Sequence, residues 1–264
     1  MIFKTLLAAL LLAVPASSQA LAADQKPLYA DLKSPVGMIY DRLGNLYVSE
    51  WSAGRVSKFD QNGKRSVLAE AVPGPSGLAF DGEGTLYIAS YGDGGIYALE
   101  PVGKARKIAS GFSSPAGLLW AKDNYLLVAN RNAGELVKVL PDGSKEVLHR
   151  GLATPVGLAQ ADDGTIFINC FNGGIEMITT DGQRSTIYRG LNTPGVGLVA
   201  DGQDVLAVDY GGTTVTRVTR QGRASIVAGG LNSPVALAKM PDGRFLVGTW
   251  GDNAAFAFKM NGGK

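Results

Sequence analysis

The chain has 264 residues, of which 45% are hydrophobic and 18% are charged, so it can bury a sizeable core as a globular protein. The formal net charge is only +2 and no basic run is present, so we do not expect nucleic acid as a partner. The one cysteine, Cys170, cannot form an internal disulfide, so the core alone must hold the fold even in an oxidising compartment.

The N-terminal segment has the pattern of a secretory signal. A single lysine precedes a nine-residue apolar run, 6–14, and small residues lead to a cleavage site near Ala22 or Ala23. Nine apolar residues are too few to span a bilayer, and no longer run occurs elsewhere, so no membrane span is predicted. We expect removal of residues 1–23, which would leave residues 24–264 as a soluble periplasmic protein with a net charge of +1 (24 Lys and Arg minus 23 Asp and Glu).

The rest of the chain repeats one unit about every 40 residues. A proline recurs at spacings of 40, 40, 40, 39 and 40, at Pro35, Pro75, Pro115, Pro155, Pro194 and Pro234. Each unit holds four short runs rich in Val, Ile, Leu and aromatic residues, separated by Gly, Asp and Asn, which is typical of four antiparallel strands with tight turns. Four strands per 40-residue repeat predict an all-β, six-bladed β-propeller in one domain.

The two ends of the chain fit together in this scheme. The sixth unit stops after its third strand, at Lys264. The N-terminal sequence PLYADLKSP, residues 27–35, is similar to the fourth-strand sequence EVLHRGLATP, residues 146–155. We therefore expect the N-terminal segment to supply the outer strand of the last blade and to close the ring, which would remove open sheet edges.

The repeats differ at the end of each second strand. Fifteen residues after each repeat proline stands a polar or reactive residue: Glu50, Ser90, Asn130, Cys170, Asp209 and Thr249. The next position is aromatic in five units and arginine in one: Trp51, Tyr91, Arg131, Phe171, Tyr210 and Trp250. Equivalent strand ends share one face of a propeller, so we expect these twelve residues to form two rings near one channel mouth.

The two rings predict a ligand site with an aromatic wall and a polar floor. Such a cavity suits sugars, flat rings or a cation. A structural alternative stays open, because aromatic residues at strand ends also pack between blades and small polar residues also cap loop amides.

Three oxygen-bearing residues of the polar ring fall in alternate blades: Glu50, Asn130 and Asp209. Oxygen donors converging on one axis would suit a hard cation such as Ca²⁺ or Mg²⁺. Glu50 or Asp209 would also serve as a general base if desolvated. The alternative is three separate side chains that are solvated or cap loops.

Catalysis by Cys170 would require a neighbouring base. The only histidine, His149, is expected in the outermost strand of the third blade, far from the channel, and Arg131 is no base. We therefore expect Cys170 to be a small buried side chain. A single histidine also excludes a zinc site built from several histidines and a Ser-His-Asp triad.

The unit S-P-x-G-L-A-x-D-x-x-G-x-L-Y-V-A, followed by G-x-I, resembles the NHL-repeat blade. Residues 27–264 are similar to the broad six-bladed group that includes the senescence-marker-protein/gluconolactonase family, and virginiamycin B lyases carry similar units. The resemblance implies the propeller fold. It also implies, for gluconolactonase-like members, a divalent metal held in the channel by Glu, Asn and Asp.

This sequence departs from the catalytic patterns of those families. One metal-ligating Asn usually stands just before the Gly-Leu of a first strand, where the first four units have Val36, Ser76, Ala116 and Val156. The fifth and sixth units read Pro-Gly-Val-Gly and Val-Ala there, so no unit supplies the Asn. The histidine base of the lyase group has no counterpart either.

Two functions follow from these observations. The first is an exported propeller that binds a small molecule or another exported protein, without catalysis, through the ring from Glu50 to Trp250. The alternative is a metal-assisted hydrolase of the lactonase type that uses Glu50, Asn130 and Asp209. The residues favour the first slightly, and whether the chain is an enzyme stays open.

Overall fold

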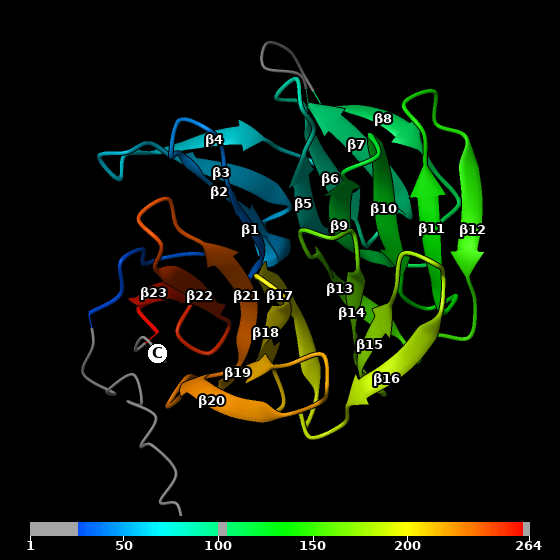
Figure 1. Cartoon of the computed structure of the whole chain (residues 1–264). Helices are drawn as coiled ribbons and strands as arrows, with labels where there is room; N and C mark the ends of the chain where they lie inside the picture. The colour runs from blue at the N-terminus through cyan, green and yellow to red at the C-terminus, as the bar shows by residue number, and fades with distance from the viewer. Residues whose placement is uncertain (1–25, 100–104, 261–264) are drawn as a thin grey trace, which may run out of the picture.

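The chain folds into a ring of six antiparallel sheets around a central axis (Figure 1). The computed structural model describes residues 26–99 and 105–260, and these ranges contain 23 strands. Five sheets have four strands and one has three, always in sequence order within the sheet. The predicted six-bladed propeller is thereby confirmed. The expected signal segment, residues 1–23, lies outside the described residues.

Blades one to three follow the 40-residue repeat. Blade one has β1 (Pro35–Tyr40), β2 (Leu46–Glu50), β3 (Arg55–Phe59) and β4 (Arg65–Ala69). Blade two has β5 (Pro75–Phe80), β6 (Leu86–Ser90), β7 (Gly95–Leu99) and β8 (Arg106–Ala109). Blade three has β9 (Pro115–Ala121), β10 (Tyr125–Asn130), β11 (Glu135–Val139) and β12 (Lys145–His149). Each repeat proline therefore begins an innermost strand.

Blades four to six continue the pattern. Blade four has β13 (Pro155–Gln160), β14 (Ile166–Cys170), β15 (Gly174–Ile178) and β16 (Arg184–Tyr188). Blade five has β17 (Pro194–Asp201), β18 (Asp204–Asp209), β19 (Val215–Val218) and β20 (Ala224–Ala228). Blade six has β21 (Pro234–Lys239), β22 (Phe245–Thr249) and β23 (Ala254–Phe258). The helical element of the described ranges is a single 3₁₀ turn, Trp51–Ala53. In these ranges no helix is long and apolar enough to cross a bilayer.

The innermost strands surround the axis in close contact. Contacts run from β1 to β5, β9, β13, β17 and β21 and back to β1. A glycine in each of the first five inner strands allows this approach, because a Cβ at Gly77 would lie 2.5 Å from the carbonyl oxygen of Ala116 in the next blade. The blade-six counterpart is Ala236, which is fully buried. The glycine of the G-L repeat is thus a packing requirement in the first five blades, whereas the sixth accommodates an alanine.

The hydrophobic core is divided among the six junctions between neighbouring blades. Each of the six clusters of buried residues combines side chains from two adjacent sheets. Between blades two and three, for example, Tyr87 stacks on Trp120 with ring centroids 5.3 Å apart. Every blade therefore depends on both neighbours for the burial of its apolar side chains.

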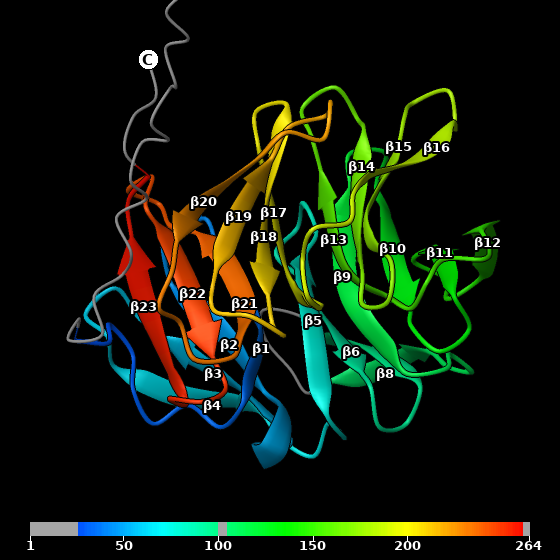
Figure 2. The ribbon, with the colours of Figure 1, turned by 90° about the horizontal axis from the view of Figure 1, so that it is seen from below.

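The N-terminal segment lies against β23, the last strand, in both views (Figure 1, Figure 2). One antiparallel bridge joins Tyr29 to Ala255, and the amide of Leu32 donates to the carbonyl of Asn253 at 2.8 Å. Leu32 is fully buried in the cluster between the last and first blades. The segment thus pairs with the edge of β23 through a single bridge, whereas the sequence predicts a full fourth strand.

Candidate functional site: an aromatic cup at one channel mouth

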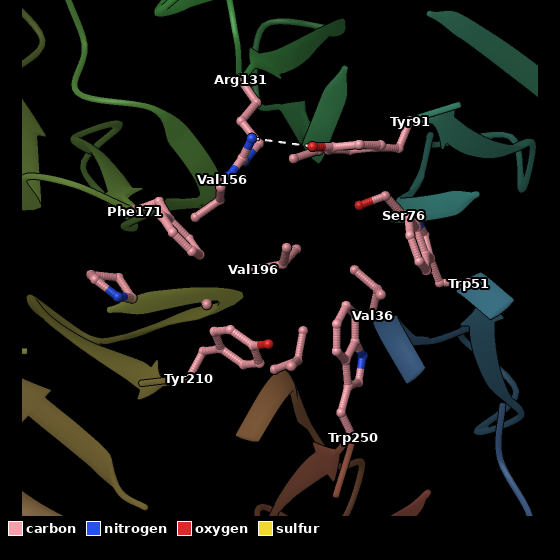
Figure 3. Close-up of a pocket in the computed structure, with 14 residues that line it drawn as sticks. Val36, Trp51, Ser76, Tyr91, Arg131, Val156, Phe171, Val196, Tyr210 and Trp250 are labelled. Atoms are coloured by element: carbon pink, nitrogen blue, oxygen red, sulfur yellow. Dashed lines mark hydrogen bonds between the residues drawn. The ribbon is translucent and has the colours of Figure 1, made fainter. Parts of the chain in front are cut away.

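One mouth of the channel holds a cavity of about 290 Å³. Its wall consists of the side chains that directly follow the six second strands: Trp51, Tyr91, Arg131, Phe171, Tyr210 and Trp250 (Figure 3). Its floor consists of residues from the innermost strands, chiefly Val36, Ser76, Ala116, Val156, Val196 and Val235. We call this cavity, with its wall and floor, the aromatic cup.

The wall is a closed circle of side-chain contacts. Trp51 contacts Tyr91 edge to face at 6.1 Å between ring centroids, and it stacks on Trp250 at 5.9 Å. Tyr210 contacts Trp250 at 5.6 Å and Phe171 at 6.3 Å. The guanidinium of Arg131 closes the circle, because it lies 5.0 Å from the Phe171 ring centroid and 5.8 Å from that of Tyr91. Each blade therefore contributes one member, and each member is held by its two neighbours.

Backbone hydrogen bonds fix where the wall begins in most blades. The amide of Trp51 donates to the carbonyl of Ser34 at 3.1 Å, and the amide of Trp250 donates to Ser233 at 3.0 Å. Both acceptors directly precede a repeat proline and have left-handed backbones, with φ of 53° and 54°. The left-handed conformation costs free energy for residues other than glycine, and residues that adopt it often lie near ligand sites. In four blades the residue before the repeat proline therefore presents the carbonyl that anchors the wall residue.

Two further contacts orient the tryptophans. The indole Nε1 of Trp250 donates to the carbonyl of Pro35 at 3.0 Å, which ties the last blade to the first. Trp51 packs so closely on Gly74 that a Cβ there would lie 2.7 Å from its indole nitrogen. Trp51 nevertheless remains 38% exposed. The cup thus has one firmly held tryptophan and one that is open to solvent.

The floor differs from the sequence-based expectation. A polar floor was predicted, but four of the six main floor positions are valine and one is alanine. The sixth is Ser76, whose hydroxyl has no hydrogen-bond partner among the described residues. The alternation of side chains explains the difference: where the wall residue faces the cup, the preceding residue faces the interior of its own blade.

Glu50 shows this opposite orientation most clearly. Its carboxylate is fully buried and accepts hydrogen bonds from the Ser57 hydroxyl, the Arg55 and Arg65 guanidinium groups and the Lys33 amide. Burial alone would raise the pKa of Glu50, but the hydrogen bonds from Ser57, Arg55 and Arg65 outweigh it and hold the pKa below its usual value. Glu50 is therefore a stable carboxylate that joins strands of blade one.

The side chains of Asn130 and Asp209 are also hydrogen-bonded to neighbouring residues. The Asn130 carbonyl oxygen accepts from the Ser113 amide at 2.7 Å, and its amide group donates to Glu135 at 3.0 Å. Asp209 accepts from the Thr193 amide at 2.9 Å and from the side chain of Asn192 at 2.7 Å. Both side chains cap the segment that leads into the innermost strand of their blade.

None of Glu50, Asn130 and Asp209 lines the aromatic cup, and each is hydrogen-bonded to other residues of its own blade or of the segment leading into it. Their oxygens accept hydrogen bonds from local amides, hydroxyls and guanidinium groups, which leaves poor donors for Ca²⁺ or Mg²⁺. No cluster of three His, Cys, Asp or Glu side chains suited to a metal occurs in the described ranges. The hydrogen bonds of the three side chains are thus structural in this arrangement, and a metal held by Glu50, Asn130 and Asp209 stays a prediction.

The other members of the polar ring are buried structural groups. Ser90 donates to the carbonyl of Pro73 at 2.8 Å, and Thr249 donates to Asp252 at 3.0 Å. Cys170 is fully buried, and burial together with the nearby Glu176 charge raises the pKa of its thiol to about 12. His149 lies on β12, the outermost strand of blade three. A thiolate nucleophile and a histidine base are thus both missing from the aromatic cup.

Comparisons with known proteins place the chain by its fold. No family model matches the sequence, and no curated protein matches it. A gluconolactonase from Xanthomonas campestris superposes with a TM-score of 0.78 at 18% identity, covering 89% of each chain. The calcium-binding protein regucalcin from Agrobacterium tumefaciens gives 0.74 at 17% identity, covering 90% of this chain and 92% of its own. Virginiamycin B lyase from Staphylococcus aureus gives 0.68 at 15% identity, covering 88% and 86%.

These structural neighbours agree with the resemblance read from the repeat unit. At identities of 15–18%, the likeness is one of architecture and carries no residue roles. The chain is a six-bladed β-propeller whose fold is shared with gluconolactonases, regucalcin and virginiamycin B lyase.

Proposed function

We propose that the chain is an exported binding protein that holds a small, flat organic molecule in the aromatic cup. The observation that carries this proposal is the closed circle of five aromatic rings and one guanidinium around a single cavity. Aromatic walls give large contact areas at low cost in side-chain entropy, and concave apolar cavities with a few polar groups are the usual ligand sites.

The chemistry of the cup supports binding over catalysis. Its lining contains no carboxylate, histidine or cysteine, so no residue there can act as a general base or nucleophile in the ways those side chains do. The hydroxyls of Ser76 and Tyr210 line the cavity and have no protein hydrogen-bond partner in the described ranges. They can orient a ligand by hydrogen bonds without any change in protonation.

A screen of small aromatic compounds by thermal unfolding tests the proposal. A compound that binds only the native state raises the melting temperature. We expect hits that stabilise the wild type but not the Trp51→Ala variant, since Trp51 is exposed and its loss opens the wall. Trp120→Phe, which alters a tryptophan stacked on Tyr87 between blades, is the matched control and should keep the shift. Equal shifts in wild type and Trp51→Ala would refute the cup as the site.

The alternative is a metal-assisted hydrolase of the lactonase type. Its support is the shared fold with a protein described as a gluconolactonase and with one described as calcium-binding. It would require Glu50 or Asp209 to leave its present hydrogen bonds. A melting-temperature rise with Ca²⁺ or Mg²⁺ that disappears in Glu50→Gln combined with Asp209→Asn would favour this alternative and would count against a metal-free cup.

Export is a further part of the proposal and rests on the sequence of residues 1–23 alone. N-terminal sequencing of the protein from a periplasmic fraction tests it. Cleavage near Ala22 or Ala23 is the expected result, and a full-length N-terminus in the cytoplasmic fraction would contradict it.

A further inference from the structure

Arg131 is the one charged residue in the lining of the aromatic cup. It reaches the wall from the end of β10 and lies between the rings of Tyr91 and Phe171 (Figure 3). Its Nη1 donates to the Tyr91 hydroxyl at 3.1 Å and to Asn132 Oδ1 at 2.8 Å. The guanidinium is thus held at the edge of an apolar cavity by neutral partners alone.

No carboxylate balances this charge. Among the described residues, none of the eleven ion pairs includes Arg131. By contrast, the arginines nearest to the polar ring of blade one, Arg55 and Arg65, both pair with Glu50. The hydrogen bonds of Arg131 use Nη1 only, so Nη2 and Nε have no acceptor within the described ranges. An unbalanced cation with free donors is a binding group for an anion.

The surroundings of Arg131 define the rest of the ligand. The wall offers ring faces and the floor offers Val156 and Val196, so the body of the ligand must be apolar and flat. A cavity of about 290 Å³ is at the small end of ligand sites, which limits that body to one or two rings. The apolar floor lowers the local dielectric and strengthens an ion pair with the guanidinium.

We infer that the ligand of the aromatic cup is a small aromatic carboxylate, whose carboxylate pairs with Arg131 while its ring lies against the aromatic wall. A planar carboxylate matches the fork of donors on a guanidinium, and one cation balances one negative charge. An amine would be repelled by the half-buried guanidinium, and a neutral compound would make no ion pair with it. This inference rests on the proposed function, because it names the class of molecule that the cup would hold.

The test is a matched series measured by isothermal titration calorimetry with the mature protein. Phenylacetate, phenylacetamide and phenethylamine share one ring and differ in charge, and the corresponding indole compounds extend the series by a second ring. We expect the acids to bind about tenfold or more tightly than the amides, the range of a charge-assisted hydrogen bond, and the amines not to bind. Raising the salt concentration should weaken only the acids.

Two variants isolate the role of the charge. Arg131→Gln should reduce the acid to the affinity of the amide, and Arg131→Lys, which keeps the charge but loses the fork, should fall between them. Melting temperatures close to that of the wild type would show that both variants keep the fold. Equal affinities of acid and amide in the wild type, or tighter binding of phenyl phosphate than of phenylacetate, would overturn the inference and leave the binding cup intact. If none of these compounds binds, the binding function of the cup and the carboxylate ligand are both refuted for molecules of one or two rings.

Discussion

Trp51 of the first blade stacks on Trp250 of the last blade, with ring centroids 5.9 Å apart and an interplanar angle of 26°. Two stacked indoles couple their electronic transitions, so we expect an exciton couplet in the circular dichroism of the folded protein. Trp51→Phe should abolish the couplet, and Trp120→Phe should preserve it because Trp120 lies between blades two and three. A couplet that survives Trp51→Phe would contradict the stacking.

Glu50→Gln should destabilise the protein. The buried carboxylate accepts hydrogen bonds from two guanidinium groups and one hydroxyl, and a neutral amide cannot replace charge-assisted bonds to both arginines. We expect a loss of about 2 kcal/mol in the free energy of unfolding, the scale of a hydrogen bond to a charged group. Urea unfolding at neutral pH measures it. An unchanged midpoint would show that the ion pairs contribute nothing.

The same carboxylate gives stability a dependence on pH. The pKa of Glu50 in the folded chain is below its usual value of 4.5, because the hydrogen bonds from Ser57, Arg55 and Arg65 outweigh burial. Folding therefore favours the ionised form, so its contribution is complete above the unfolded pKa and is lost as the pH falls through the folded pKa. The difference in stability between wild type and Glu50→Gln should therefore shrink as the pH falls below the usual value of 4.5. A difference that grows on acidification would reverse the sign of the argument.

Gly77→Ala should destabilise the ring at its centre. The new Cβ would lie 2.5 Å from both the Ala116 carbonyl and the Leu118 amide, so neighbouring blades would have to separate. Overpacking of this kind costs about 1–3 kcal/mol. Gly82→Ala is the matched control, because no atom lies within 4 Å of a Cβ there and its backbone is compatible with alanine. Thermal unfolding of the two variants should separate them clearly, and equal melting temperatures would refute the close approach.

Cys170 should be unreactive in the native protein. The side chain is fully buried, and the pKa of its thiol is raised to about 12 by burial and by the charge of Glu176. Only the thiolate reacts readily with disulfide and maleimide reagents. We therefore expect labelling to follow unfolding in a denaturant titration. Stoichiometric labelling of the folded chain would restore Cys170 as a candidate nucleophile.

The fold could be predicted from the sequence because the repeat in the sequence is regular. A proline begins every innermost strand and a polar turn follows it at the same distance, so the 40-residue period determines blade number and strand order. The period also locates the end of each second strand. The position of Trp51 at the channel mouth follows from that count alone.

The direction of individual side chains could not be predicted from the repeat in the same way. Glu50 and Trp51 are adjacent, and the repeat assigns both to the mouth, but only Trp51 lines the cup. The orientation of Glu50 depends on Arg65, which lies fifteen residues later on the outermost strand. The same spacing joins Glu135 to Arg150 in blade three.

The bridge between Tyr29 and Ala255 constrains the order in which contacts can form during folding. The two residues stand 226 positions apart, so this bridge can form only after the last strand of the last blade has been made. Contacts of such long sequence separation form late, because a long loop must close first. Trp51 and Trp250 meet across the same junction, so the wall of the aromatic cup is complete only when the first and last blades are in contact. The signal of the stacked tryptophan pair therefore reports the closure of the ring between the first and last blades.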